Sequence, residues 1–392
     1  MTSEWKTSPL RDLVGFISKG IAPSYADEES ETTVRVLNQK CNRNFRITYS
    51  ESRLHDLARK KVPAERFVRI DDILINSTGA GTAGRIAQIC NLPCDTIVDG
   101  HMIIIRANDK VSQKYLGYAM KAHQWEVLQL DEGSTGQTEL NRERLLDEIM
   151  ISYPTSFSLQ EMVVKTLEGI DQKLLINEKV NDNLQKQAAA LFANFYDQAE
   201  TEVGFTEMIQ ILGGGTPKTG ESSYWNGDIP FFTPKDVGFP YTLTTEKTIT
   251  EEGLAHCNSR LYPINTVFVT ARGTVGKVGL PGVPMAMNQS CYALVGKDTH
   301  QLLVYFYTLK AVDRLKHKAS GAVFDAITTR DFEAENIMKL SDDDTKAFLD
   351  VAEPIYQAVL NNSIENLRLA ELRDSLLPKL MNGEIDVSGI QL

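Results

Sequence analysis

Hydrophobic positions in one stretch of the chain recur at the spacing of a long helix. The series advances by three or four residues at each step and runs through Val163, Leu167, Ile170, Leu174, Asn177, Asn181, Leu184, Ala188, Leu191 and Phe195. Steps that alternate in this way mark the seam by which one helix packs against another. We therefore predict a helix from Leu159 to about Phe195, about 55 Å long at 1.5 Å per residue.

The same series returns 185 residues later in the sequence. Its second copy runs through Phe348, Ala352, Ile355, Val359, Asn362, Asn366, Leu369, Arg373, Leu376 and Leu380. Arg373, in place of Ala188, is the one change of character, and both Asn recur. Buried Asn in a seam costs stability and fixes register, so the matched pairs favour a duplication over two unrelated surface helices. Each copy is therefore interpreted as a globular domain followed by a long helix.

The duplication predicts how the two helices face each other. The second helix should start near the end of the first and run back, which makes the pair antiparallel. The register that matches Asn with Asn sets Asn177 opposite Asn366 and Asn181 opposite Asn362. The same register determines the other facing pairs: Leu174 with Leu369, Leu184 with Val359, Leu167 with Leu376, Phe195 with Phe348, and Ile170 with Arg373. We expect the stem of Arg373 to pack while its head reaches water.

The two globular copies show the same order of predicted elements. In the first copy these are an opening helix at Leu10–Ile17, extended runs at Thr33–Leu37, Phe67–Ile75 and Ile97–Arg106, a helical stretch at Gln113–Leu130, and a short helix at Asn141–Glu148 that opens with a capping Asn. In the second copy they are an opening helix at Phe205–Leu212, strands at Asp228–Phe232, Thr266–Val269 and Met287–Leu294, and a helical stretch at Gln301–Lys316. A polar loop at Ser134–Gly136 corresponds to Ala319–Gly321.

Strands and helices mix without regular alternation, so each copy is expected to be an α+β domain. The predicted fold is thus two tandem, pseudo-symmetric domains of mixed α and β structure, separated by a long antiparallel two-helix coiled coil. We place the first domain at residues 1–157, the first helix at 158–198, the second domain at 199–344, and the second helix with its tail at 345–392.

The composition of the chain indicates its domain content and its cellular compartment. The chain has 392 residues, of which 42% are hydrophobic and 24% charged, enough for two or three domains. Nothing resembles a signal peptide, and no apolar run approaches the ~20 residues of a membrane span. The five Cys are scattered, so a reducing cytoplasm is expected, with Cys90 and Cys94 as two isolated buried thiols rather than half of a zinc site.

The net charge of −11 argues against nucleic acid, but the charge is unevenly distributed. The segment Arg35–Arg69 holds ten basic residues and three acidic ones. A phosphate-binding face can lie there while acidic regions meet other partners. An ordinary solvated face accounts for the same charges.

Glycine-rich segments do not indicate a cofactor site. Gly79–Gly84 matches the dinucleotide fingerprint, but the sequence after it is too short for the helix that holds a pyrophosphate. The related segment Arg272–Pro281 has more helix breakers, so we predict a glycine-rich β-turn in both copies. Gly215–Thr219 lacks the ending of a phosphate loop, and no catalytic motif repeats between the copies.

These features resemble the specificity subunit of type I restriction–modification enzymes. The matching segments are Gly213–Lys218, Trp225–Phe231, Asn288-Gln289 before a strand, and the ending Leu376–Ile385. The resemblance covers the whole chain and is strongest in the second copy. In the first copy Lys19–Pro23 stands where Gly-Gly-Thr-Pro is expected, which fits two domains that read different sequences.

The resemblance implies a non-catalytic subunit that binds double-stranded DNA. Each globular copy would be a target recognition domain for one half of a split, asymmetric site, and the helices would be the spacer. The helices would also dock the modification (methyltransferase) subunits, two of them, which bind S-adenosylmethionine, and through these the restriction and translocase subunits. No cofactor and no membrane contact is expected for this chain itself. Residues 159–198 carry four basic and six acidic side chains, which suits protein partners.

Candidate DNA-facing cations follow from the same resemblance. They are Lys40, Arg43, Arg46 and Arg85 in the first domain and Lys218, Lys235, Arg272 and Lys277 in the second. For each of them a solvated surface charge is the alternative. Asn288 and Gln289 are expected to be internal hydrogen-bonding residues at a strand start rather than base readers.

Two other classes of function remain open. One is a stand-alone, S-adenosylmethionine-dependent DNA methyltransferase or nuclease, against which the lack of an Asn/Asp-Pro-Pro-Tyr/Phe motif speaks. The other is a coiled-coil scaffold with no DNA role, which the basic segment Arg35–Arg69 makes less attractive.

Overall fold

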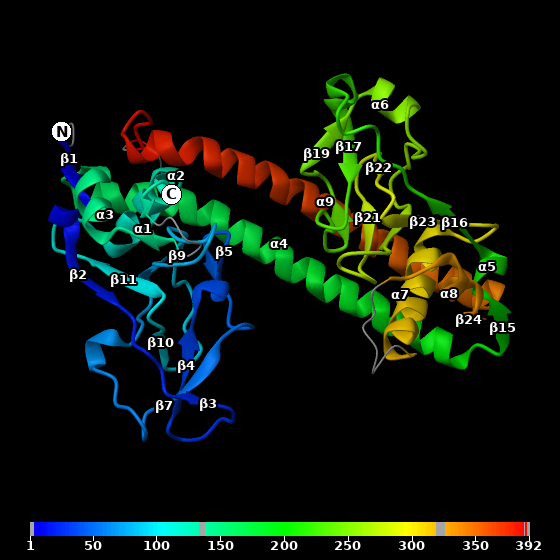
Figure 1. Cartoon of the computed structure of the whole chain (residues 1–392), viewed down its shortest axis with the longest axis horizontal. Coiled ribbons are helices and arrows are strands. Elements are labelled where there is room, and N and C mark those ends of the chain that lie inside the picture. The colour runs from blue at the N-terminus through cyan, green and yellow to red at the C-terminus, as the bar shows by residue number, and fades with distance from the viewer. Residues whose placement is uncertain (1–3, 133–137, 319–325, 388, 390–392) are drawn as a thin grey trace. The chain divides into compact units, whose positions relative to one another are not determined.

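A computed structural model describes residues 4–132, 138–318, 326–387 and 389. The chain forms two compact units: Met1–Lys173 with Ala370–Leu392, called unit 1, and Leu174–Leu369, called unit 2. Each long helix is divided between the units. The predicted polar loops at 134–136 and 319–321 lie outside the described residues. Figure 1 shows the elements of both units.

The central sheet of unit 1 is antiparallel and buried on both faces. Its strands lie in the order β2-β11-β8-β9. Their bounds are Val14–Lys19 for β2, Met102–Ala107 for β11, Ile73–Asn76 for β8 and Ile86–Gln88 for β9. Ile103 and Ile105 enter one hydrophobic core, whereas Met102 and Ile104 enter another. Because successive side chains point to opposite faces, the continuous apolar run of β11 serves both cores.

A second sheet in unit 1 has the order β10-β4-β7-β3. Its strands are β10 (Thr96–Val98), β4 (Thr33–Leu37), β7 (Arg53–Asp56) and β3 (Tyr25–Ala26). The other elements of unit 1 are β1 (Trp5–Pro9) paired with β14 (Met150–Pro154), the hairpin β5–β6 (Asn42–Arg43, Arg46–Ile47), β12–β13 (Asp131–Glu132, Glu139–Leu140), α1 (Gln113–Ala122), α2 (Gln124–Leu128) and α3 (Arg142–Glu148). Asn141 caps α3 through its side chain, as the sequence predicted.

Unit 2 repeats the strand order of both sheets, except that its second sheet has three strands in the described residues and corresponds to β10-β4-β7. The central sheet is β16-β23-β20-β21, extended by β18, and the second sheet is β19-β17-β22. The strands are β16 (Ile209–Gly213), β23 (Cys291–Gly296), β20 (Val267–Thr270), β21 (Val278–Pro281), β18 (Tyr241–Thr242), β19 (Lys247–Ile249), β17 (Trp225–Phe232) and β22 (Ala286–Met287). Beside them lie β15 (Thr201–Gly204) paired with β24 (Asn336–Lys339), α5 (Phe205–Met208), α6 (Glu251–Ala255), α7 (Gln301–Lys318) and α8 (Thr329–Glu333). The duplication therefore extends to strand order.

Several predicted elements differ from the observed ones. Leu10–Ile17 is a 3-10 turn, Leu10–Leu13, followed by β2, and α5 likewise gives way to β16 after Met208. Backbone pairing with β11 and β23 overrides the helical spacing of these short apolar runs. Of the predicted run Phe67–Ile75 only its end lies in a strand, and Ile97–Arg106 is divided into β10 and β11.

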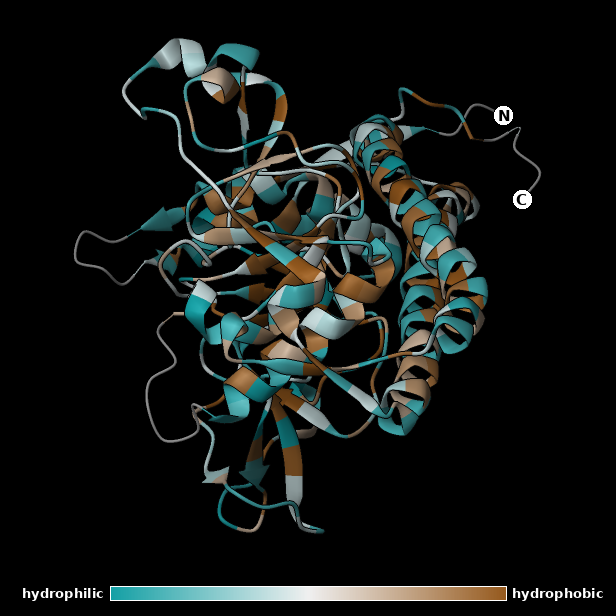
Figure 2. Cartoon of the chain, turned by 90° about the vertical axis from the view of Figure 1, so that its right-hand side faces the viewer, coloured by the Kyte–Doolittle hydropathy of each residue, from teal (hydrophilic) through white to brown (hydrophobic). Residues whose placement is uncertain are grey.

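Two further expectations need correction. The helical stretch Gln113–Leu130 breaks at His123 into α1 and α2. Cys90 and Cys94 are exposed rather than buried. Hydrophobic residues are concentrated in the inner strands and helices of the globular parts, as Figure 2 shows.

The two long helices are α4 (Phe157–Gln198) and α9 (Asp342–Met381). In unit 2 their seam contains two amide pairs. Asn177 Nδ2 donates to Asn366 Oδ1, and Asn362 Nδ2 donates to Asn181 Oδ1, both at 2.8 Å. Asn177 and Asn181 are buried. These are the pairs that the offset of 185 residues predicts, and their order shows that the two segments run antiparallel.

In unit 1 the start of α4 packs with the end of α9. Val163 and Leu167 share a core with Leu377 and Leu380. The head of Arg373 does not reach water as expected: Nη1 donates to Asp171 Oδ1 (3.1 Å), and the side chain is only 14% exposed. A carboxylate one residue from Ile170 thus partners the guanidinium in a half-buried layer, where an ion pair is less screened than at the surface.

The last turns of α4 carry an aromatic cluster that the seam did not predict. Phe192 stacks on Phe306 of α7 with ring centroids 4.9 Å apart and meets Phe348 edge-on at 5.4 Å. The predicted partner of Phe348, Phe195, is only half-buried. Because α7 covers this end of α4, the buried face is wider than a two-helix seam and includes Tyr196.

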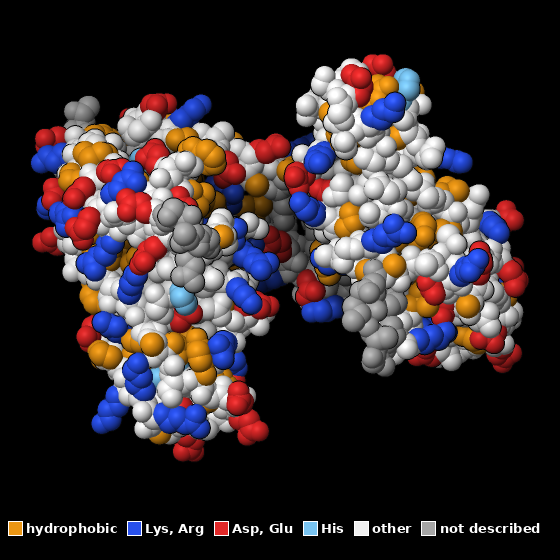
Figure 3. Space-filling model, viewed as in Figure 1, with side chains coloured by type: hydrophobic (Ala, Val, Ile, Leu, Met, Phe, Trp, Pro, Cys, Tyr) orange, Lys and Arg blue, Asp and Glu red, His pale blue; other side chains and the backbone are white. Residues whose placement is uncertain are grey.

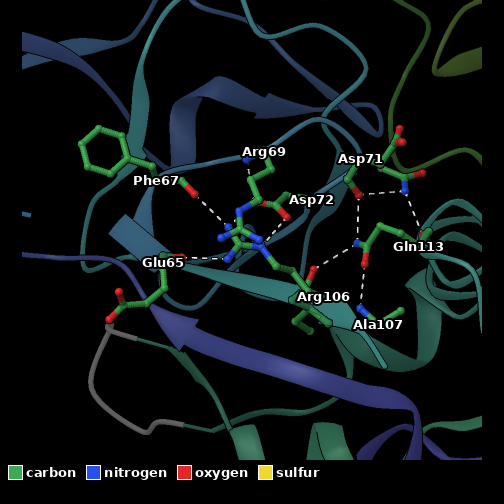
Figure 4. A network of polar contacts seen from close by, with 10 residues as sticks. Glu65, Phe67, Arg69, Asp71, Asp72, Arg106, Ala107 and Gln113 are labelled. Atoms are coloured by element: carbon green, nitrogen blue, oxygen red, sulfur yellow. Dashed lines mark hydrogen bonds and ion pairs between the residues drawn. The ribbon is translucent and has the colours of Figure 1, made fainter. Parts of the chain in front are cut away.

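A buried ion pair in unit 1 links β11 to the residue that directly precedes β8 (Figure 4). Arg106 of β11 donates to both oxygens of Asp72, at 2.7 and 2.8 Å, and also to the carbonyls of Glu65 and Phe67 at 2.8 Å. The Asp72 side chain is 2% exposed, and it also accepts a bond from the Arg69 backbone N–H. The pair therefore holds the segment that leads from the second sheet into β8.

We expect the Asn177→Leu variant to lower the stability of unit 2. The half-buried Asn366 amide would lose a partner, at a cost of about 1–3 kcal/mol. Hydrogen exchange of residues 174–198 measures the loss of protection. Asn183, which is exposed on the same helix, provides the matched control as Asn183→Leu, and the double variant Asn177→Leu/Asn366→Leu should regain part of the protection. Equal effects of the Asn177 and Asn183 variants would contradict a structural role for the pair.

The Arg106→Met variant should destabilise unit 1 by about 3–5 kcal/mol, because it leaves the buried Asp72 carboxylate without its cation. Amide exchange in β8 and β11 reports the change. The exposed ion pair of Arg144 with Glu148 serves as control, since Arg144→Met should leave the same amides unchanged. If both variants gave the same protection as the native chain, the pair would not support the fold.

Candidate nucleic-acid interface

The turn between β8 and β9 in unit 1 has the same backbone frame as the turn between β20 and β21 in unit 2. The N–H of Gly84 donates to the Asn76 carbonyl, and the N–H of Gly276 donates to the Thr270 carbonyl, each at 2.8 Å. In return the Asn76 N–H donates to the Arg85 carbonyl (2.9 Å), and the Thr270 N–H donates to the Lys277 carbonyl (3.0 Å). Arg85 and Lys277, both candidate cations, therefore occupy equivalent positions.

The start of each turn is held by a neighbouring strand. Ser77 N–H donates to the His101 carbonyl and Ala271 N–H to the Ser290 carbonyl, each at 2.8 Å. The next residues, Thr78 and Arg272, each form an isolated bridge to a later segment of their own unit. Thr78 thus stands in unit 1 where Arg272 stands in unit 2.

Glycine is required where these turns begin. Gly79 and Gly273 have φ angles of 116° and 82°, which L side chains rarely adopt. A Cβ at Gly79 would also lie 2.3 Å from the Thr82 hydroxyl. Both segments are β-turns between antiparallel strands, as the sequence predicted, and the turn Gly79–Gly84 is two residues longer than Gly273–Gly276.

A second loop reaches the same place from the second sheet. Leu37, at the end of β4, accepts a backbone bond from Asp99 (3.0 Å), and Phe232, at the end of β17, accepts one from Asn288 (2.9 Å). Lys40 and Lys235 each lie three residues past the end of the strand, within a turn that one backbone hydrogen bond closes. In unit 1 the Cys41 N–H donates to the Asn38 carbonyl, and in unit 2 the Asp236 N–H donates to the Thr233 carbonyl, each at 2.9 Å. Lys40 and Lys235 are therefore also equivalent, and both are exposed.

Side chains tie this loop to the turn in each unit. In unit 1 Asn42 Nδ2 donates to the Arg85 carbonyl (2.8 Å) and to Asn76 Oδ1 (3.2 Å). Asn42 opens the β5–β6 hairpin, in which Arg43 pairs with Arg46. In unit 2 the Thr274 hydroxyl donates to the Pro234 carbonyl (3.1 Å), next to Lys235.

Seven of the eight candidate cations have exposed side chains: Lys40, Arg43, Arg46, Lys218, Lys235, Arg272 and Lys277. Arg85 is half-buried and donates to the Gly81 carbonyl (3.3 Å). Lys235 lies 3.8 Å from Glu246. The Lys218 carbonyl accepts a bond from Trp225 Nε1 (3.2 Å) of β17.

Part of the basic segment Arg35–Arg69 has structural partners instead. Arg35 pairs with Glu29, Arg59 with Asp56 at 3.2 Å, and the Arg53 guanidinium lies 3.4 Å from the centre of the Tyr25 ring. Basic and acidic side chains are interspersed on the face seen in Figure 3. The total charge of the segment therefore overstates what is available to a phosphate.

Comparison with known proteins identifies the family. The protein-family model described as "Type I restriction modification DNA specificity domain" matches residues 2–186 and 201–339 of this chain. The chain belongs to this family. Both matches fall on the duplicated halves, so each half is one specificity domain with its long helix or the approach to it.

Characterised relatives match over parts of their length. The chain is 32% identical over 124 residues to the "Type I restriction enzyme MjaIX specificity subunit" of Methanocaldococcus jannaschii, which covers 30% of this chain and 29% of that protein. It is 29% identical over 185 residues to the HindI specificity subunit of Haemophilus influenzae, covering 46% and 40%. The matches thus span less than half of these relatives.

The fold is shared over nearly the whole chain. The crystal structure of the S subunit of the type I restriction–modification system from M. genitalium superposes with a TM-score of 0.58. The match covers 97% of this chain and 96% of that one, at 13% identity. Among the described residues no helix is long and apolar enough to span a membrane, and no group of three or more His, Cys, Asp or Glu residues is placed to hold a metal.

Structure adds polar residues to this specificity-domain face that the sequence did not single out. The Thr78 hydroxyl lies 2.7 Å from His101 Nδ1 and 3.4 Å from Gln39 Oε1. The three residues come from three segments, so they are identified only by their equivalence with residues of unit 2, at offsets of 195, 194 and 189 residues. As expected, the side chains of Asn288 and Gln289 accept internal hydrogen bonds. Asn288 accepts one from the Ser290 N–H (3.0 Å), and Gln289 accepts one from the Thr216 hydroxyl.

Asp99 is a buried acid at the base of this face. Its Oδ1 accepts the His101 N–H (2.9 Å), in the way that Asn288 accepts the Ser290 N–H. Burial raises the pKa of Asp99 above its ordinary value of 3.8, partly opposed by the bond from His101 and the charges of His101 and Arg53. Unit 1 thus keeps a carboxylate where unit 2 has a neutral amide of the same shape.

We expect the Asp99→Asn variant to stabilise unit 1 at pH 7. Because the folded pKa is raised, ionised Asp99 costs stability above that pKa, and the cost is absent below the unfolded value of 3.8. The gain should therefore be full at neutral pH and vanish as the pH falls towards 4. Thermal unfolding between pH 4 and 8 tests this, with Asp95→Asn at an exposed acid as control. A gain that persists at pH 4 would rule out the charge as its cause.

Proposed function

We propose that this chain is the DNA-recognition subunit of a type I restriction–modification enzyme. Each specificity domain binds one half of a bipartite, asymmetric DNA site. The observation that carries the proposal is the equivalence of Lys40 with Lys235 and of Arg85 with Lys277 on two copies of one scaffold. Cations held in the same place by the same backbone bonds suit a ligand whose phosphates repeat while its bases vary.

The regions divide by role. We assign recognition to residues 1–157 and 199–344, and the spacer to residues 158–198 and 345–392. Phosphate contacts position each domain, whereas side chains at base edges supply the discrimination. The net charge of −11 makes a strong, salt-tolerant complex of the lone chain with DNA unexpected, so partner subunits contribute to the affinity.

The long helices are the docking elements for two methyltransferase subunits, which bring S-adenosylmethionine, and through them for the restriction and translocase subunits. On α4, Leu175, Ile176 and Val180 are 41%, 55% and 40% exposed, in a helix whose seam is filled by other residues. Apolar side chains of this size are costly in water and suit a protein contact. The chain itself supplies no methyl-transfer or cleavage chemistry in this proposal.

Co-expression with the partner methyltransferase tests the proposal. Methylation-aware sequencing of the host genome should show methylation at one split, asymmetric site, and none when either gene is left out. Methylation of one continuous palindrome would contradict the two-domain assignment. Saturable binding of S-adenosylmethionine to the isolated chain would favour a self-contained methyltransferase instead, and a complex that never shifts DNA would favour a scaffold.

A further inference from the structure

The chain contains its own internal comparison of two specificity domains. Backbone hydrogen bonds align the turn and the loop of unit 1 with those of unit 2 residue by residue, as described above. If the two domains read different half-sites, the shared positions and the differing positions of this face should have different roles. This reasoning rests on the proposed function.

The shared positions carry one chemistry. Lys40 matches Lys235, and Arg85 matches Lys277, so a cation recurs both at the end of the loop and at the end of the turn. A phosphate is the same in every sequence, so its contacts need not change between half-sites. These four residues fit phosphate contacts.

The differing positions form a group between them. In unit 1 the group is Gln39, Thr78 and His101, which lie within hydrogen-bonding distance through Thr78. The equivalent residues of unit 2 are Pro234, Arg272 and Ser290. A linked set of polar groups thus stands where unit 2 offers one exposed guanidinium.

We infer that this group reads bases. In unit 2, Arg272 recognises a guanine of its half-site, and in unit 1, Gln39, Thr78 and His101 together recognise the other half-site. The guanidinium of Arg272 can donate two bonds to guanine O6 and N7 in the major groove, while a Gln amide matches adenine. Gly273 follows Arg272 directly, and the nearest atom that a Cβ added there would meet is Pro234 Cβ, at 3.8 Å, so DNA can approach the backbone there.

The turns support the same division. Beyond the shared glycine, unit 1 inserts two more residues before Arg85 than unit 2 does before Lys277. The flanking cations keep their backbone bonds despite this difference in length. A loop that varies between fixed ends is typical of a surface that carries specificity on a constant scaffold.

The test compares variants in the complex with the partner methyltransferase, with the genome-wide methylation pattern as the readout. Arg272→Ala and Arg272→Lys should both relax one G·C position of one half-site. Discrimination at that position should fall about tenfold or more, since a bidentate contact supplies about that factor. Lys retains the charge but loses the two-bond geometry. Gln39→Ala should relax the other half-site only.

Lys235→Ala and Lys277→Ala should leave the methylated sequence unchanged while weakening DNA binding. The affinity of each variant should also depend less steeply on salt concentration, because binding releases roughly one counterion fewer. Arg330→Ala removes an exposed cation of α8 and is the matched control that should change neither property. Hydrogen exchange of β20 and β21 shows whether each variant is folded, and Arg272→Lys provides the test if Arg272→Ala is not.

Three results would overturn the inference. Arg272 variants that weaken binding at every sequence alike would make Arg272 a phosphate contact. Altered specificity in Lys277→Ala would erase the division of roles, and changes in the same half-site by Arg272 and Gln39 variants would refute the assignment to separate halves. A native complex that methylates no split site would instead refute the proposed function itself.

Discussion

Four side-chain amides in the helix seam can satisfy one another in only one register. Asn177 bonds to Asn366 and Asn181 to Asn362, each at 2.8 Å, and the remaining donors reach the carbonyls of Val359 and Leu174 at 3.3 Å. A shift by one heptad would place at least three of the four amides against an apolar side chain and cost about 1–3 kcal/mol for each unsatisfied group. The seam gives up some apolar burial in return for a single alignment.

The consequences of that alignment extend to the core of unit 2. With the amides in place, Phe192 packs against both Phe306 of α7 and Phe348 of α9. The helix α7 also packs on the central sheet through the same hydrophobic cluster. A slipped seam would therefore disturb the packing beneath the β20–β21 turn as well as the helices, so the register is a condition for the geometry of the candidate interface.

Sequence reasoning succeeded where the determining contacts were periodic or duplicated. The seam, the capping role of Asn141 and the glycine turns all follow from local spacing. It failed at Leu10–Ile17, where a short apolar run suits a strand as well as a helix and β11 decides the outcome. It did not anticipate that Arg35 and Arg59 are paired with acids: the fold brings Glu29 to Arg35, whereas Asp56 lies only three residues before Arg59.

Of the candidate site, the cations were predictable and the polar group was not. Lys40, Arg85, Arg272 and Lys277 stand out by charge beside glycine or a strand end. Gln39, Thr78 and His101 are separated by 39 and 23 residues, and no local pattern relates them. Their relation appears only when hydrogen bonds of one unit are compared with those of the other.

Duplication followed by divergence gives these observations a common physical cause. The backbone bonds that define each turn use no side chains, so they survive substitution at Thr78 or Arg272 without loss of the frame. In the proposed function, contacts to phosphate constrain only the sign of the charge, so Arg85 and Lys277 can differ in kind but not in charge. Contacts to bases constrain shape and hydrogen-bonding pattern, and they must change whenever the target changes. A face that keeps its cations and exchanges the residues between them can therefore acquire a new half-site without refolding.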